Sequence, residues 1–188
     1  MTDLTLGSYG FKEIDSYVTN SQTVSSVNLD VNTNTEDSRV VVIIGTTGLS
    51  SSTNGWVNFR LMDASSHNIS YVVTSTGETS VLRSSSSSRG IIHRRQASNT
   101  NAGQATGRRV NWTMHISFGS LYTTPITNTV AFSDASYWEA EGTAGISSSF
   151  LGIRNNDSQP TYQVQFYPYS GYMTSPAIRA FALCSLAA

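Results

Sequence analysis

The chain has 188 residues, a formal net charge of -1 and only 12% charged side chains, against a usual share of roughly 25%. This length suits one domain spanning residues 1–188 with a sizeable core. The near-neutral balance disfavours nucleic acid and acidic membranes as partners, and no run approaches the roughly 20 apolar residues that cross a bilayer. One cysteine, Cys184, excludes an internal disulfide framework.

The first part of the chain combines a polar leader with a turn rich in Asp and Asn. Residues 1–10 (MTDLTLGSYG) contain too little apolar surface to pack alone, and we predict an arm that orders on contact with a partner. Asp30–Asp37 (DVNTNTED) partly matches a calcium-binding loop, but Thr35 and Val41 replace the Gly and Glu that such a loop needs. A turn built from Asx residues is the favoured interpretation, and a weak calcium site near Asp30 is the alternative.

Alternation of apolar and polar residues, which is typical of strands with one covered face, dominates the rest of the chain. It is clearest between residues 108 and 118, and shorter alternating runs occur at residues 57–61, 69–74 and 161–166. Val40–Ile44 (VVVII) and Ile178–Leu186 (IRAFALCSL) are apolar on both faces, which predicts central strands covered on both sides. A short helix is the alternative for the second of these runs.

A polar segment interrupts this pattern at residues 83–107, which include five consecutive serines. Its length predicts a functional or mobile loop, either an arm that packs on a neighbouring subunit or a loop in solvent. Five arginines within this segment or directly after it are candidates for binding an acidic patch on a partner protein, and charges that only aid solubility are the alternative. They are Arg89, Arg94, Arg95, Arg108 and Arg109.

Turn sequences rich in Gly, Ser and Asn separate the predicted strands, for example TTGLSSSTNG at residues 46–55. Many short strands with such turns between them predict an all-β fold. We expect an antiparallel β-sandwich, jelly-roll-like, in a single domain that carries the long Ser-rich loop.

Residues that carry chemistry in enzymes do not form a recognisable site. Glu139 and Glu141 (WEAEG) would project from the same side of a strand, as paired carboxylates of a glycoside hydrolase require, but nothing marks one of them as the acid. His67, His93 and His115 lack metal-ligand spacing, and no GxSxG sequence accompanies the serines. We therefore expect no catalytic residue, metal or cofactor, and a depolymerase that uses the two glutamates is the enzyme alternative.

Aromatic side chains offer a different kind of site, since sugar rings stack on the faces of Trp and Tyr. The candidates for glycan contact are Tyr137 and Trp138 together with Tyr167, Tyr169 and Tyr172. The alternative interpretation is that these tyrosines lie at the rims of strands, where tyrosine is common, and contact no ligand.

Five segments, in their order along the chain, resemble a known module. They are EIDSY at Glu13–Tyr17, RVVVIIG at Arg39–Gly45, WVNFRLMD at Trp56–Asp63, FLGIRN at Phe150–Asn155 and YSGYMTSPAIRAFAL at Tyr169–Leu183. This order is similar to a β-sandwich module in structural proteins of tailed bacteriophages, which opens with an ID.Y segment and closes with an SGxIRLYGL strand. Pro176 and Ala177 depart from the Gly-Thr step of that pattern.

The resemblance implies a virion structural protein without catalytic residues. The first expectation is a capsid decoration or cement protein, a homotrimer that binds the major capsid protein or another virion protein and is assembled in the host cytoplasm. The composition agrees, because Ser, Thr and Asn lose less rotamer entropy than Lys or Glu when a partner covers them. A head-fibre or tail module that binds a host receptor or carbohydrate is the alternative.

Overall fold

The computed structural model describes residues 9–31, 40–50, 57–62, 71–77, 80–87, 89–93, 109–119, 128–138, 146–154 and 162–185. These residues form antiparallel strands in two sheets, and the described part of the chain contains no helix. The predicted all-β, antiparallel, sandwich-like fold is therefore confirmed. The jelly-roll connection pattern stays a prediction.

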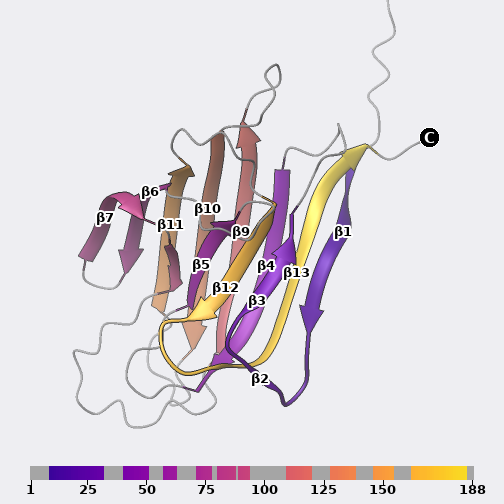
Figure 1. Ribbon diagram of the computed structural model, residues 1–188, viewed down its shortest axis with the longest axis vertical. Coiled ribbons are helices and arrows are strands. Elements are labelled where there is room, and N and C mark those ends of the chain that lie inside the picture. Colours follow the sequence, from indigo (N-terminus) through magenta and orange to yellow (C-terminus); the bar gives the residue numbers. More distant parts are fainter. Residues whose placement is uncertain are drawn as a thin grey trace, which may run out of the picture.

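The large sheet has nine strands, and Figure 1 shows the small sheet overlapping its middle. The short β2 (Thr23–Val24) pairs only with β13. The other strands follow the order β1 (Tyr9–Val18), β13 (Met173–Ser185), β4 (Val40–Leu49), β9 (Arg109–Gly119), β10 (Asn128–Trp138), β11 (Ile146–Arg154), β6 (Tyr71–Gly77) and β7 (Ser80–Ser87).

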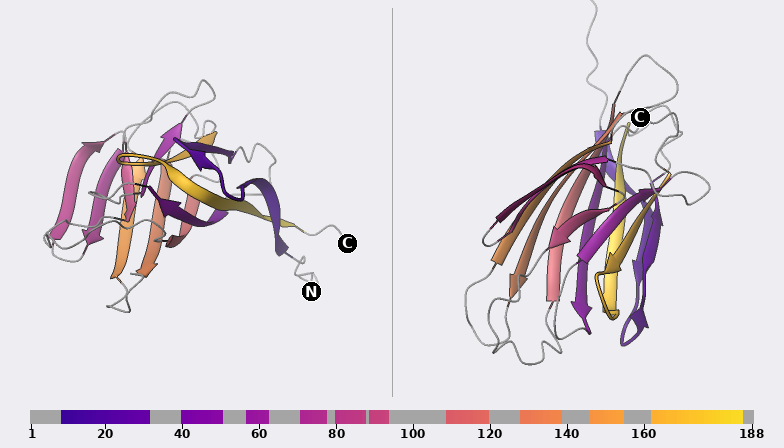
Figure 2. Two further views of the ribbon diagram at one scale, coloured as in Figure 1. Left: turned by 90° about the horizontal axis from the view of Figure 1, so that it is seen from below. Right: turned by 60° about the vertical axis from the view of Figure 1, so that its left-hand side comes forward.

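The small sheet has four strands in the order β3 (Val27–Asp30), β12 (Gln163–Pro168), β5 (Val57–Met62) and β8 (Gly90–His93). At one end β3 contacts β1 and β13, and at the other end β8 contacts β10, β11 and β6. The small sheet therefore covers one face of the large sheet, as the two further views in Figure 2 show.

The core lies between the two sheets because every second residue of the facing strands is apolar. On β9, the four alternate residues from Val110 to Ile116 are buried, whereas the polar residues between them are exposed or half-buried. Phe166 of β12 is fully buried, and its ring centroid lies 5.6 Å from that of Trp112. Full burial of such a side chain contributes about 1.5–3 kcal/mol. The alternation predicted between residues 108 and 118 and at residues 161–166 is confirmed where side chains are described, whereas in the run at residues 57–61 the polar Asn58 is buried together with its apolar neighbours.

Trp112 packs directly on the neighbouring strand at Gly45. The two residues are cross-strand partners of β9 and β4. A Cβ atom at position 45 would overlap the indole ring. The strand therefore requires glycine here, because any larger residue would displace the largest side chain of the core.

The edge strand β1 is tied to both sheets. Its register against β13 shifts between Glu13 and Asp15. The carboxylate of Asp15 accepts hydrogen bonds of 2.7 Å from the backbone N–H groups of Ser16 and of Asp30 in β3. Hydrogen bonds to an ionised carboxylate are stronger than those between neutral groups, so this side chain joins the edges of the two sheets.

An irregularity in β13 accommodates the proline that departs from the bacteriophage pattern. The register against β4 shifts between Thr174 and Ala177, and proline is tolerated within a sheet at such bulges. Ser175 in this bulge has a positive φ of 46°, and its backbone N–H donates to the carbonyl of Gln22 at 2.8 Å. Pro176 is thus compatible with a long strand at this point.

Two predicted segments differ from the observed strands. Residues 83–107 are not one loop, because β7 extends to Ser87 and β8 begins at Gly90. Pairing of β7 with β6 and of β8 with β5 satisfies the backbone, which the serine content does not reveal. Tyr9 and Gly10, predicted within an N-terminal arm, belong to β1. Residues 1–8 and 94–107 lie outside the described residues.

The two runs that are apolar on both faces form strands, as predicted, but only one face of each is fully covered. Val41 and Ile43 of β4 are buried, whereas Ile44 is 52% exposed. On β13, Ala180 is buried and Arg179 is exposed. The expectation of layers on both sides is wrong, because the small sheet packs against a single face of the large sheet.

Candidate functional site

The outer face of the large sheet presents apolar side chains that no described strand covers. Phe11 of β1 is 56% exposed and Ile44 of β4 is 52% exposed, while Val42 and Phe181 are half-buried. Cross-strand register places Phe181 opposite Val42, which in turn lies opposite His115. Directly opposed residues project from the same face of a sheet. We call this surface the large-sheet face, defined by Phe11, Val42, Ile44, His115, Arg179 and Phe181.

The large-sheet face contains one ion pair whose two charges compensate each other. Nη1 of Arg179 lies 2.7 Å from Oε2 of Glu13. This hydrogen bond, with a second one that involves Ser16, lowers the pKa of the Glu13 carboxyl below its ordinary value. Since both side chains are solvent-exposed, the pair adds little to folding stability. The ion pair has a local effect, because the opposite charges of Arg179 and Glu13 leave no net charge at these two positions of the apolar surface.

The outer face of the small sheet carries polar side chains that are hydrogen-bonded to each other across three strands. Gln163 Nε2 donates to Asp30 Oδ1 at 2.7 Å, and Gln165 Nε2 donates to Asn28 Oδ1 at 3.0 Å. Nη1 of Arg60 donates to Gln165 Oε1 at 3.4 Å. We call this surface the small-sheet strip, defined by Asn28, Arg60, Gln163, Gln165, Tyr167 and Tyr169.

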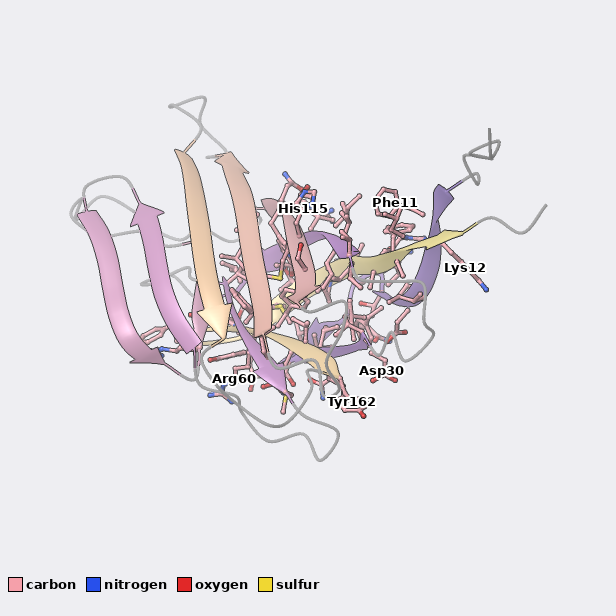
Figure 3. The ribbon with its side chains drawn as sticks, turned by 90° about the horizontal axis from the view of Figure 1, so that it is seen from above. Phe11, Lys12, Asp30, Arg60, His115 and Tyr162 are labelled. Carbon is pink, nitrogen blue, oxygen red and sulfur yellow. The ribbon has the colours of Figure 1, made fainter. Side chains whose placement is uncertain are left out.

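Figure 3 shows the two surfaces on opposite sides of the sandwich. Phe11 and His115 lie on one side, and Asp30, Arg60 and Tyr162 lie on the other. Protein or ligand bound to one surface therefore leaves the other accessible.

Two arginines stack on two tyrosines at one end of the small-sheet strip. The guanidinium carbon of Arg60 lies 4.4 Å from the ring centroid of Tyr167, and that of Arg89 lies 5.7 Å from the ring centroid of Tyr169. These distances are typical of cation–π contacts. The structure thus brings together Arg89 and Tyr169, which the sequence predicts as members of two separate sites.

A tight turn holds Tyr169 and Tyr172 in place after β12. Gly171 has a φ of 75°, which favours glycine. Backbone N–H of Tyr172 donates to Ser50 Oγ at 2.7 Å, and backbone N–H of Ser50 donates to the carbonyl of Tyr172 at 2.9 Å. Tyr169 and Tyr172 are nevertheless 47% and 54% exposed, so both rings remain available for contact.

Buried polar atoms without partners lie beside the stacked tyrosines. Asn58 is fully buried although it lies opposite Tyr167, on the outer face of the small sheet. Neither polar atom of its side chain has a hydrogen-bond partner, and the same is true of Arg60 Nε and the Tyr167 hydroxyl. Alternation predicts an outward-facing Asn58 in solvent, and the burial of this residue contradicts that expectation.

The other predicted site residues do not join the stacked tyrosines. Arg109 is exposed at the start of β9, on the same side of the strand as His115, and the backbone register pairs it with Trp138. Tyr137 and Trp138 belong to β10, where only the backbone is described. Arg94, Arg95, Arg108, Glu139 and Glu141 lie outside the described residues, so the five-arginine patch and the glutamate pair stay predictions.

Metal chemistry finds no support in the described part of the chain. No group of three or more His, Cys, Asp or Glu side chains that could hold an ion occurs there. Asp30 accepts a hydrogen bond from Gln163, and residues 32–39 of the predicted calcium loop lie outside the described residues.

Comparison of the chain with protein-family models, curated proteins and solved structures finds no match. None of the described residues forms a helix able to span a membrane. The candidate function therefore depends on the two outer faces and their chemistry.

Proposed function

We propose that this chain is a non-enzymatic structural protein of a virion, a decoration or cement protein that assembles as a homotrimer on the capsid. The large-sheet face is the surface through which it binds other protein. The exposed apolar side chains of that face are the observation that carries the proposal.

Uncovered apolar surface is costly for a chain that remains alone in water. Burial of such surface contributes about 25 cal/mol per Å², and contiguous exposed apolar patches mark sites of protein–protein contact. Phe11 and Ile44 gain this contribution only when another protein covers them. The face therefore favours association over a solitary state.

The polar groups of the same face are suited to burial under a partner. Glu13 and Arg179 already form an ion pair, and removing a paired charge from water is less unfavourable than removing an unpaired one. Thr113 is half-buried and Ser117 is exposed on β9, and such short side chains lose little rotamer entropy on contact. A sheet surface with these residues fits a structural partner better than a small molecule.

Replacing the two most exposed aliphatic and aromatic positions tests this role. We expect the Phe11→Thr, Ile44→Thr double variant to fold but to remain monomeric, while the unaltered chain forms concentration-dependent trimers in sedimentation velocity. Threonine preserves the preference for strands, so the free energy of unfolding should change by less than about 1 kcal/mol. Tyr172→Thr, an exposed position outside this face, is the matched control and should assemble normally.

A monomeric unaltered chain at about 100 µM, far above the concentration at which micromolar interfaces form, would contradict the homo-oligomer. Trimers that persist unchanged in the double variant would exclude the large-sheet face as the interface. Peptide mass analysis of purified virions from the source culture tests the location, and absence of the chain from particles would overturn the virion role.

A further inference from the structure

The small-sheet strip is pre-organised before any ligand arrives. Gln163 is held by Asp30, and Gln165 is held between Asn28 and Arg60. Side chains fixed in this way have already lost rotamer freedom on folding, so less entropy remains to be lost on binding. Each carboxamide carries two donors and two lone pairs, of which Gln165 uses one donor toward Asn28 and one lone pair toward Arg60.

The length of the strip indicates an extended ligand. Residues 163, 165 and 167 alternate along one side of β12, and Tyr169 follows in the turn after it. At about 3.3 Å per residue the three positions on β12 span roughly 13 Å. A single sugar or a free anion would occupy only one end of this row.

Two guanidinium groups lie at the tyrosine end of the strip. Arg60 stacks on Tyr167 and Arg89 stacks on Tyr169. Within the described residues no carboxylate pairs with Arg60, which contacts the ring of Tyr167 and the Gln165 amide. Asp30, an acidic side chain that the described residues place on this surface, lies at the opposite end beside Gln163. Charge complementarity therefore favours an anionic group near the tyrosines.

Unpartnered buried atoms at the same end form a second, independent indication. The Asn58 carboxamide, Arg60 Nε and the Tyr167 hydroxyl have no hydrogen-bond partner. Buried polar groups in folded proteins are almost always paired with protein, water or ligand. Three such groups beside two stacked aromatic rings are a concentration of unmet hydrogen-bonding capacity.

We propose that the small-sheet strip binds an acidic oligosaccharide, a chain of sugars that carry carboxylate groups. The amides of Gln163 and Gln165 bind ring hydroxyls, which both donate and accept. The rings of Tyr167 and Tyr169 contact the apolar faces of the sugars. The guanidinium groups of Arg60 and Arg89 bind carboxylates through charge-assisted hydrogen bonds. This site is independent of the large-sheet face, because it lies on the opposite side of the sandwich (Figure 3).

Titration of the isotope-labelled full chain with three acidic hexasaccharides, followed by NMR, tests the proposal. The probes are oligomannuronate, oligogalacturonate and hyaluronan. We expect saturable shifts for at least one of them, confined to β3, β5, β12 and the turn after β12. Tyr169→Ala and Gln165→Ala should each weaken binding at least about tenfold, the range of a lost good contact. Phe11→Thr, on the large-sheet face, should bind like the unaltered chain.

Failure of all three hexasaccharides to produce saturable shifts would overturn the proposal. Equal affinity for neutral cellohexaose would overturn the acidic class, and shifts on the large-sheet face alone would overturn the location. The two variants alter exposed or half-buried side chains, and a native-like spectrum shows that each is folded. Loss of sugar binding in the titration would leave assembly in sedimentation velocity unchanged. The two experiments therefore distinguish failure of this proposal from failure of the structural role.

Discussion

The two outer faces of this sandwich differ in the side chains that they expose: those of the small sheet are polar and hydrogen-bonded to each other, and those of the large sheet include uncovered apolar residues. On the small sheet, Gln163 and Gln165 bond to their cross-strand neighbours, so these polar side chains are held in place within one chain. On the large sheet, Phe11 and Ile44 have no covering partner in the described residues. The difference teaches that only the large-sheet face gains apolar burial from covering protein, whereas the small-sheet strip offers specific hydrogen bonds.

The largest loss of stability should come from a substitution in the core between the two sheets. Phe166→Ala removes a fully buried ring that packs on Trp112, and we expect a loss of about 3–5 kcal/mol in the free energy of unfolding. Gln165→Ala, the adjacent residue of β12 on the outer face, is the matched control and should cost less than about 1.5 kcal/mol. Urea denaturation measures both, and equal losses would break the distinction between the inner and outer faces of this strand.

A smaller effect is expected at the contact between β4 and β9. Gly45→Ala places a Cβ atom within the space of the Trp112 indole, and overpacking of this kind costs about 1–3 kcal/mol. Ile44→Thr, one residue away on the exposed face, should cost less than about 1 kcal/mol. Urea midpoints and the near-ultraviolet dichroism of the tryptophans measure the difference. A neutral Gly45→Ala would show that the indole can move away without cost.

The smallest effect concerns the ion pair on the large-sheet face. The hydrogen bond from Arg179 is the main cause of the lowered pKa of Glu13, so the pair contributes above the ordinary carboxyl pKa and is lost as pH falls through the lowered value. Arg179→Gln should return the Glu13 pKa toward its ordinary value in a carbon-detected NMR titration, with little change in stability because the pair is exposed. A pKa that is identical in the variant and the unaltered chain would show that the pair does not form in solution.

The strands with one covered face were the most predictable part of the fold. Val110 to Ile116 alternates because the core selects every second side chain, and the register of β9 follows from that constraint. β7 could not be predicted in the same way, since its serines carry no apolar period. Backbone pairing with β6, which ends only three residues before β7 begins, stabilises this strand, and backbone hydrogen bonds do not require an alternating side-chain pattern.

The candidate site was predictable only in its individual residues. The exposed Tyr169 and Tyr172 were visible in the sequence as an aromatic cluster, but the contact between Arg89 and Tyr169 depends on how β8 and β12 are arranged in one sheet. Gln163 and Gln165 appeared only as the solvent side of one alternating run, and Asn28 belonged to no predicted strand. Their hydrogen bonds require the β3–β12 register, which alternation alone does not fix.

Hydroxyl-radical footprinting of the assembled and the dilute chain, with side-chain oxidation measured by mass spectrometry, tests most directly which face other protein covers. We expect oxidation of Phe11 and Ile44 to fall on assembly, because the large-sheet face becomes buried. Tyr169 and Tyr172 should be oxidised equally in both states. Protection of these tyrosines with unchanged oxidation of Phe11 and Ile44 would contradict the proposed assembly through the large-sheet face.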